Sequence, residues 1–391
     1  MVDYAQRMNG LTGSLIRELL KLTDKPEVIS FAGGFPSPDS FPAEAIAEIS
    51  GKVLKDEGSK LLQYGTTEGL PQLREWVASY VMKRGVITNP DNVLVLSGSQ
   101  QGIDLISKVL LDPGDVVLVE RPTYLTAINV FKAYQADIRD VEMDEFGLIP
   151  EKLEASILAH KPKLLYTIPT FQNPSGVTAS STRREKLMEI VKRHHIVMVE
   201  DDPYGALRYD GEVVPYMSHF DTQGVSLLLG SFSKTISPGL RTGFAVGDKS
   251  LISKMVICKQ GTDVHTSNLS QRIVAEFCSK GYFEPHLDKI IPAYKVKRDA
   301  MLKAMEEYFP PQTRWIKPEG GLFIWCELPE NVDTPVLLEE ATRQNVAFIP
   351  GVPFFVDESG KNTMRLNFSN ASLEGIEAGM KRLGRVISEA I

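Results

Sequence analysis

The chain has 391 residues, of which 43% are hydrophobic and 24% charged, and this ordinary globular composition excludes a mainly disordered or fibrous protein. Its formal net charge of −7 argues against a nucleic-acid binder, which would usually carry a basic surface. No apolar run is long enough to span a membrane, and Met1 to Lys21 lacks a signal-peptide core, so we expect a cytoplasmic protein.

The first predicted helix lies at residues 13–22, where apolar side chains recur with helical spacing. Arg17 is off the apolar face of this helix, and from spacing alone a solvated arginine explains it. An extended segment, 28–36, follows and contains Gly33 and Gly34. These two glycines suit either a plain turn or the close approach of another group to the backbone.

Helices are then expected at 43–55 and 71–84. Between them, Tyr64 lies in a loop rich in glycine and threonine. An aromatic side chain in such a loop more often packs than takes part in chemistry.

From residue 93 onward, short apolar strands alternate with amphipathic helices. The expected strands are 93–96, 116–119, 164–168, 196–199, 225–229 and 243–246. The expected helices are 100–111, 123–134, 150–160 and 182–195. Thr182 and Glu185 form a candidate capping box at the start of the last helix. This alternation predicts an α/β fold with a mostly parallel central sheet flanked by helices on both faces.

The pattern changes after Gly281. A long helix is expected over 282–308, interrupted by Pro285 and Pro292. Beyond it the expected strands are 320–325, 346–349 and 364–368, and the expected helices are 334–344 and 372–388. This order predicts a smaller α+β domain at 286–391, after a large domain at 43–285.

Ligands of parallel sheets bind beyond the carboxyl ends of the strands, so the residues that follow each strand are the candidates for a site. Ser99 and Gln100 begin a helix whose free N–H groups suit a phosphate. Tyr124 stands near a helix start, where its ring could stack on a planar ligand or simply pack. Asn173 offers an amide on a turn that is also common without any ligand.

Three consecutive carboxylates, Glu200, Asp201 and Asp202, follow the strand at 196–199. One of them could pair with a protonated ring nitrogen, or all three could cap the following turn. They offer too few ligands for a metal ion. The three cysteines lie too far apart for a disulfide framework or a zinc site, so no metal is expected.

The stretch 231–243 follows an apolar strand and combines hydroxyls with one lysine and one arginine. Lys234 could form a Schiff base, while Ser231, Ser233 and Arg241 could hold a phosphate. A serine- and glycine-rich surface loop explains the same residues when they are taken alone. Together with the other strand ends, the stretch fits pyridoxal 5'-phosphate (PLP), which uses a lysine and an acidic partner for its ring nitrogen.

Nearly end to end, the sequence resembles the class I aminotransferases of PLP-dependent fold type I. It is most similar to the branch with 2-aminoadipate aminotransferase, kynurenine aminotransferase II and the aromatic aminotransferases. The motifs that carry this resemblance occur in the family's order: Ser30-Phe31-Ala32-Gly33-Gly34, Gln172-Asn173-Pro174-Ser175-Gly176, Asp201-Asp202-Pro203-Tyr204, Ser231-Phe232-Ser233-Lys234 and Met364-Arg365-Leu366-Asn367-Phe368.

The resemblance implies a role for each matching residue. Lys234 would be the Schiff-base lysine and proton carrier, Asp201 the partner of the pyridine nitrogen, and Tyr204 a third member of the catalytic set. Asn173 and Tyr204 would hydrogen-bond the phenolic oxygen of the ring, and Tyr124 would stack on it. The residues implied around the phosphate are Ser99, Gln100, Ser231, Ser233 and Arg241, with Tyr64 contributed from the neighbouring subunit of a homodimer.

The resemblance also implies where the substrate binds. Arg365 would bind the α-carboxylate, and Gly34 and Asn173 would line the substrate pocket. Residues 1–42 would join the small domain and cover the active site, where Arg17 could meet an acidic side chain.

The expected activity is PLP-dependent transamination by a ping-pong mechanism, from 2-aminoadipate, an aromatic amino acid or another donor to a 2-oxo acid such as 2-oxoglutarate. The alternatives are another PLP reaction on the same fold, such as a β-lyase or decarboxylase, or a non-catalytic effector-binding regulator. Such regulators carry a basic DNA-binding domain before the fold, and the negative charge and early start of this fold argue against one.

Overall fold

The computed structural model describes residues 2–8, 11 and 27–391. The predicted helix at 13–22 and Arg17 lie outside the described residues. Within the described part, no helix is both long and apolar enough to cross a membrane.

The centre of the molecule is an eight-stranded sheet in the order β2-β9-β8-β7-β6-β3-β4-β5. Its strands are β2 (Val93–Leu96), β3 (Val116–Arg121), β4 (Asp137–Asp144), β5 (Gly147–Leu148), β6 (Leu164–Thr167), β7 (Val197–Asp202), β8 (Ser226–Ser231) and β9 (Gly243–Gly247). The five strands from β8 to β4 are mutually parallel, whereas β9 runs antiparallel between β2 and β8. Strands β2 and β6 are buried along their whole length, which explains their continuous apolar sequences.

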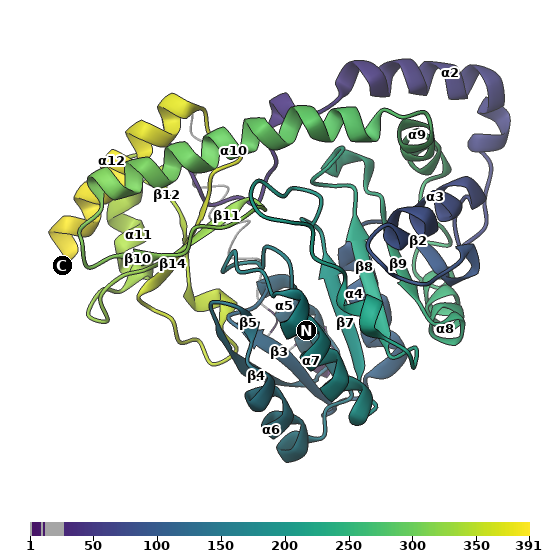
Figure 1. Cartoon of the computed structure of the whole chain (residues 1–391), viewed down its shortest axis with the longest axis horizontal. Helices are drawn as coiled ribbons and strands as arrows, with labels where there is room; N and C mark the ends of the chain where they lie inside the picture. Colours follow the sequence, from purple (N-terminus) through teal and green to yellow (C-terminus); the bar gives the residue numbers. More distant parts are fainter. Residues whose placement is uncertain (1, 9–10, 12–26) are drawn as a thin grey trace.

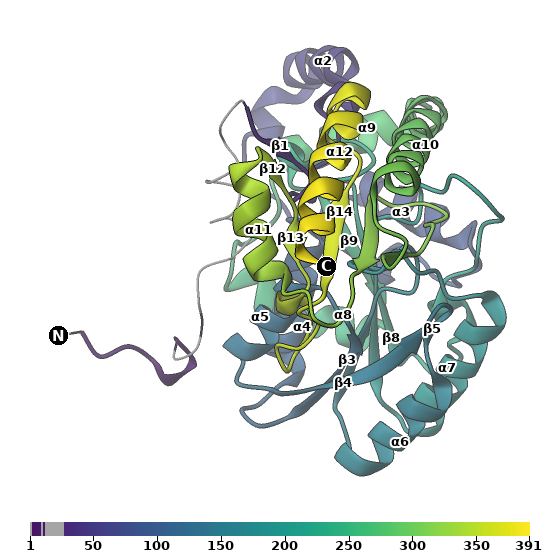
Figure 2. The ribbon, with the colours of Figure 1, turned by 90° about the vertical axis from the view of Figure 1, so that its left-hand side faces the viewer.

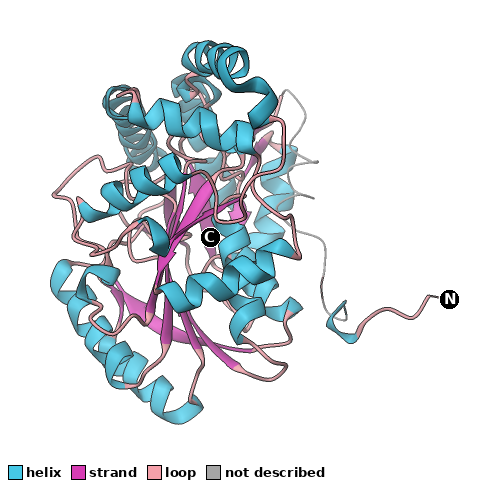
Figure 3. Ribbon diagram, turned by 90° about the vertical axis from the view of Figure 1, so that its right-hand side faces the viewer, coloured by secondary structure: helices cyan, strands magenta, loops and turns pink. Residues whose placement is uncertain are grey.

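Helices cover both faces of this sheet, and the expected α/β architecture is confirmed (Figures 1 and 3). One face carries α4 (Ser99–Leu110), α5 (Leu125–Ala133) and α8 (Lys249–Gln260). The other face carries α6 (Pro150–His160) and α7 (Ser181–Arg193). A further apolar cluster joins the β2 side of the sheet to α2 (Ala43–Leu61), α3 (Pro71–Met82) and α9 (Asn268–Ser279).

A second, antiparallel sheet has the order β10-β11-β14-β13. Its strands are β10 (Arg314–Trp315), β11 (Phe323–Glu327), β13 (Ile349–Pro350) and β14 (Thr363–Asn367). It packs beside α11 (Thr334–Arg343) and α12 (Leu373–Ala390), as Figure 2 shows. Near the start of the chain, β1 (Ile29–Ser30) pairs in parallel with β12 (Val346–Ala347). Segments from both ends of the sequence therefore build this unit.

Helix α10 (Phe283–Tyr308) spans the two units (Figure 1). Phe283 at its start packs in the cluster with α2, α3 and α9, whereas Met301 and Met305 pack against α12. Pro292 lies inside the helix without ending it. The proposed domain boundary after residue 285 falls in the first turn of this helix.

The structure corrects several sequence-based predictions. Strands β4 and β5 and helices α8 and α9 were not predicted. Strand β4 is rich in charged residues, and its buried Ile138 and Val141 are three positions apart, which breaks the two-residue alternation of a half-buried strand. The predicted capping box at Thr182 is wrong, because Ser180 caps α7 through its side chain, which accepts a hydrogen bond from Arg183 N.

Candidate active site

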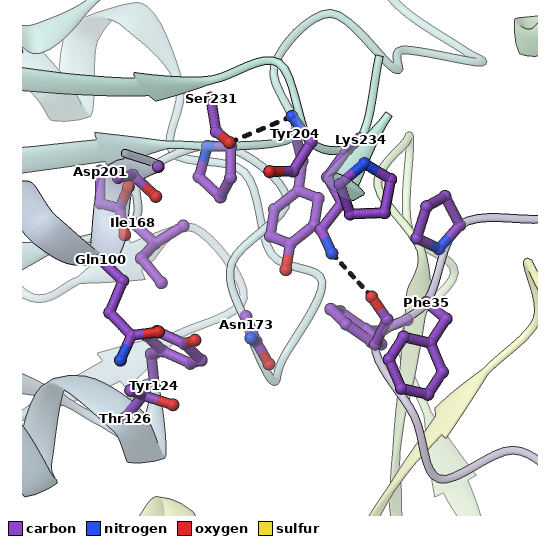
Figure 4. A pocket seen from close by; sticks show the side chains of 18 of the residues that line it. Phe35, Gln100, Tyr124, Thr126, Ile168, Asn173, Asp201, Tyr204, Ser231 and Lys234 are labelled. Carbon is purple, nitrogen blue, oxygen red and sulfur yellow. Dashed lines mark hydrogen bonds between the residues drawn. The ribbon is translucent and has the colours of Figure 1, made fainter. Parts of the chain in front are cut away.

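A cavity of about 340 Å³ lies at the carboxyl ends of the central strands, beside the N-terminus of α4. The second sheet closes it with Phe323 on β11 and Arg365 on β14. The predicted site residues that line this cavity are Gly34, Ser99, Gln100, Tyr124, Asn173, Asp201, Tyr204, Ser231, Ser233, Lys234, Arg241 and Arg365. Figure 4 shows many of them around the same space.

Two predicted residues are not among them. Tyr64 is 81% exposed and lines a separate cavity of about 430 Å³ with Lys60 and Arg272. Arg17 lies outside the described residues.

The three carboxylates of strand β7 point in alternating directions, as side chains of a strand must. Glu200 accepts hydrogen bonds from Met217 N and Ser218 N, and Asp202 pairs with the Arg84 guanidinium at 2.9 Å. Asp201, between them, lines the cavity. The alternative in which all three cap one turn is therefore wrong, and of the three only Asp201 lines the cavity that holds Lys234.

Asp201 is buried and only partly hydrogen-bonded. The Tyr166 hydroxyl donates to its Oδ2 at 2.8 Å, whereas Oδ1 has no partner among the described residues. Burial raises the pKa of Asp201 to about 7, against the opposing effect of the Tyr166 hydrogen bond. A buried carboxylate oxygen without a donor fits a ligand that brings its own N–H group, such as a protonated pyridine nitrogen.

Tyr166 was missed by the sequence analysis. It lies two residues before Ile168, which lines the cavity, and side chains two apart on a strand share a face. Alternation along β6 could therefore have placed Tyr166 beneath the site.

A candidate anion site lies where the turn before α4 meets the stretch 231–243. Gly98 has a φ of 95°, and a Cβ there would collide with the Arg241 guanidinium, so only glycine fits. Arg241 donates from Nη2 to Ser97 O at 3.0 Å, and Ser233 N donates to Ser231 Oγ at 3.1 Å. The cavity thus has a guanidinium, hydroxyls and a helix N-terminus on one side, which suits a phosphate.

Lys234 is half-buried, and its Nζ donates to Gly34 O at 2.7 Å (Figure 4). Burial lowers the pKa of Lys234 to about 8, and the charges of Arg365 and Arg241 act in the same direction. At pH 7, about a tenth of such amines are neutral. A neutral lysine is a nucleophile and a base, which is what covalent attachment of a carbonyl compound requires.

Arg365 is 1% exposed and lies 4.1 Å from the ring centroid of Phe323. Its Nη1 donates to Asn173 Oδ1 at 2.8 Å and its Nη2 to Ala32 O at 2.9 Å, while its buried Nε has no partner in the described chain. Burial lowers the pKa of Arg365 to about 10, so the side chain stays charged at neutral pH. This buried cation with unused donors suits a carboxylate.

Two aromatic alcohols complete the cavity wall. Tyr124 is the residue before α5, and the Tyr204 ring packs edge-on against Phe323 with centroids 5.7 Å apart. Burial raises the pKa of both hydroxyls, so both are neutral donors at physiological pH. Phe323 was not predicted as a site residue, because only the tertiary fold brings β11 to the ends of the central strands.

No group of three or more histidine, cysteine, aspartate or glutamate side chains in residues 2–8, 11 and 27–391 is arranged to hold a metal ion.

Comparison with known proteins identifies the family of the chain. A family model described as aminotransferase class I and II matches residues 26–383. The chain is 44% identical to aromatic-amino-acid aminotransferase 1 of Thermococcus litoralis, over 99% of this chain and 94% of that protein. It is 40% identical to 2-aminoadipate transaminase of Thermus thermophilus, over 96% of this chain and 94% of that protein.

A solved structure is similar along the same length. It is the kynurenine aminotransferase of Pyrococcus horikoshii, which is 42% identical to this chain. That enzyme was crystallised with PMP, with KYN as substrate and KYA as product. The two superpose with a TM-score of 0.95 over 99% of this chain and 97% of that one.

Proposed function

The chain belongs to the class I and II aminotransferases and is a PLP-dependent transaminase of fold type I, and from this premise we propose that it transfers the amino group of an L-amino acid to 2-oxoglutarate by a ping-pong mechanism. The observation that carries this proposal is the placement of Lys234, Asp201 and Arg365 around one cavity. The donor we propose is 2-aminoadipate, an aromatic amino acid or another donor within a broad range, and two of the similar enzymes are named for the first two.

We propose that the residues at the two ends of the cavity hold the cofactor. Asp201 Oδ1 would accept the ring N–H, and Tyr124 would stack on the ring. Ser99, Gln100, Ser231, Ser233 and Arg241, which line the cavity, would surround the phosphate. Asn173 uses its Oδ1 for Arg365, which leaves Nδ2 to donate, with the Tyr204 hydroxyl, to the phenolic oxygen. When bound, PLP supplies an aldehyde for covalent attachment and an electron-withdrawing ring.

The substrate is bound and deprotonated by two further side chains. Arg365 binds the α-carboxylate through Nε and the donors that Asn173 and Ala32 leave free. Lys234 Nζ would take the proton from the substrate Cα and carry it as an ammonium group. Its lowered pKa keeps a fraction of the amine neutral for this task. Gly34 lines the substrate side, where a Cβ would lie 3.3 Å from the Phe323 ring.

We further propose a cytoplasmic homodimer with shared active sites. Tyr64 is exposed and lines a separate cavity rather than the one that holds Lys234. A residue that completes the phosphate site of a neighbouring subunit must be exposed and lie away from its own subunit's cavity, as Tyr64 does.

Two-substrate kinetics test the proposed reaction. With 2-aminoadipate or phenylalanine as donor and 2-oxoglutarate as acceptor, we expect parallel double-reciprocal plots and one glutamate formed for each donor consumed. Intersecting plots would contradict the ping-pong order. Donor consumption without glutamate formation would instead favour a lyase or decarboxylase reaction on the same fold.

A donor panel tests the proposed role of Arg17. In the Arg17→Ala variant we expect kcat/KM to fall by about tenfold or more for 2-aminoadipate and glutamate, because a lost charge-assisted contact costs about 1.5–3 kcal/mol. The values for phenylalanine and leucine should stay within about twofold of wild type, since those side chains carry no charge to pair. An equal change for all four donors would remove Arg17 from the selection of the substrate.

A further inference from the structure

We propose that Lys259 and Asp263, which lie outside the cavity, are positioning residues that hold the phosphate-binding turn in place. The inference rests on the proposed function, because it concerns the phosphate site of that same cavity. It is carried by a partly buried chain of hydrogen bonds that leads from α8 to the turn before α4.

Lys259, near the end of α8, is fully buried. Lysines are rarely fully buried unless they have a charged partner. Its Nζ lies 2.8 and 2.9 Å from the two carboxylate oxygens of Asp263 and 2.7 Å from Gln101 Oε1. An ammonium group has three N–H donors, so these three contacts use all of them. The side chain is therefore held in one position.

The same carboxylate binds the turn before α4. Asp263 Oδ2 accepts hydrogen bonds from Ser97 Oγ at 2.9 Å and from Gln101 Nε2 at 2.8 Å. Ser97 N donates to Gln101 Oε1 at 2.9 Å, and Ser97 Oγ also lies 3.1 Å from Thr266 Oγ1. The backbone N–H and the hydroxyl of Ser97 are thus both fixed by the network around Lys259.

The opposite side of Ser97 leads to the proposed phosphate site. Its carbonyl oxygen accepts a hydrogen bond from Arg241 Nη2 at 3.0 Å. The next three residues, Gly98, Ser99 and Gln100, line the cavity. Gln100 and Gln101 are adjacent on α4 and so point to different sides of the helix, one toward the cavity and one toward Lys259.

Loss of this network should weaken binding of the cofactor's phosphate more than binding of its ring. Losing Lys259 would leave the partly exposed Asp263 carboxylate without its cation, directly behind a site for an anion. Gln101 would also lose one of the three contacts that hold its side chain. Both effects would weaken contacts with a phosphate. Asp201 and Tyr124, which would face the ring, have no hydrogen bond to this network in the described part of the chain.

The test compares two ligands that differ only in the phosphate. Full-length protein freed of cofactor is titrated with PLP and with pyridoxal, and binding is followed by the visible absorbance of the lysine-linked ligand. In Lys259→Met we expect the Kd for PLP to rise by about 10- to 100-fold, the range for a lost buried contact to a charged group. The Kd for pyridoxal should stay within about twofold of wild type.

Lys249→Met is the matched control. Lys249 is on the same helix and pairs with Asp91 at 3.0 Å, but its side chain is 68% exposed. The Kd values of this variant should equal those of wild type for both ligands. Ser97→Ala provides a milder second variant that keeps the charge pair, and we expect about a three- to tenfold rise confined to PLP.

Three results would overturn the inference. One is wild-type affinity for both ligands in Lys259→Met and Ser97→Ala. Another is an equal loss for PLP and pyridoxal, which indicates general damage to the fold. If the wild-type protein itself binds pyridoxal as tightly as PLP, the proposed phosphate site is wrong, and the inference fails together with that part of the proposed function.

Discussion

Replacing Lys234 with alanine is expected to lower the rate of transamination by at least about 10⁴-fold, the upper range for loss of a positioned acid–base group. The variant loses both the covalent attachment and the amine that moves the proton from the substrate Cα. No other lysine lines the cavity among the described residues, so no neighbouring amine can substitute. Steady-state formation of glutamate from 2-oxoglutarate measures the effect.

The control for this variant is Lys254→Ala. Lys254 lies exposed on α8, and its loss removes the same functional group from the surface. This variant should keep wild-type kcat and KM. Substantial steady-state turnover in Lys234→Ala would remove Lys234 from its proposed role, whatever the control shows.

The second large effect is expected for Asp201→Asn, in which kcat should fall by about 10²- to 10³-fold, as for loss of one preorganised electrostatic group. Asparagine has nearly the same shape as aspartate but carries no charge, so it cannot stabilise a protonated ring nitrogen. Steady-state kinetics measure kcat, and the Kd for the cofactor should rise in parallel because Oδ1 loses its charge.

The Tyr166→Phe variant separates the effect of losing the Asp201 charge from the effect of losing the hydrogen bond that Tyr166 donates to it. That variant keeps the Asp201 carboxylate and removes only the 2.8 Å hydrogen bond to Oδ2. We expect a fall in kcat of about tenfold, well below that of Asp201→Asn. A wild-type kcat in Asp201→Asn, or equal losses in the two variants, would contradict the proposed pairing of Asp201 with the ring nitrogen.

The strand ends of the central sheet could be predicted from sequence because each strand is a short apolar run followed at once by polar residues. Lys234, Asn173 and Tyr124 all follow such runs, and all three line the cavity. The local sequence alone did not distinguish Asp201 from Glu200 and Asp202, and before the structure only the family resemblance did. That distinction depends on the register of β7 and on the partners of its two faces, which only the folded chain supplies.

The contacts that join distant segments could not be predicted. Arg365 meets Asn173 across 192 positions of sequence, and Lys259 meets Gln101 across 158. Neither contact leaves a local periodicity. The charged strand β4 was missed for a related reason, since pairing with β3 holds it in the sheet although its own residues do not alternate regularly. Helix α8 did carry a signal, because Ile252, Met255 and Val256 recur with helical spacing.

The most direct test of the central claim, that Lys234 is the covalent anchor of the cofactor, is borohydride reduction of the purified protein followed by peptide mapping. We expect a single phosphopyridoxyl group on Lys234 Nζ. Adding an amino donor without an oxo acid before the reduction should prevent the labelling, because the donor replaces the lysine. A label on another lysine, or no label in protein that contains the cofactor, would contradict the account.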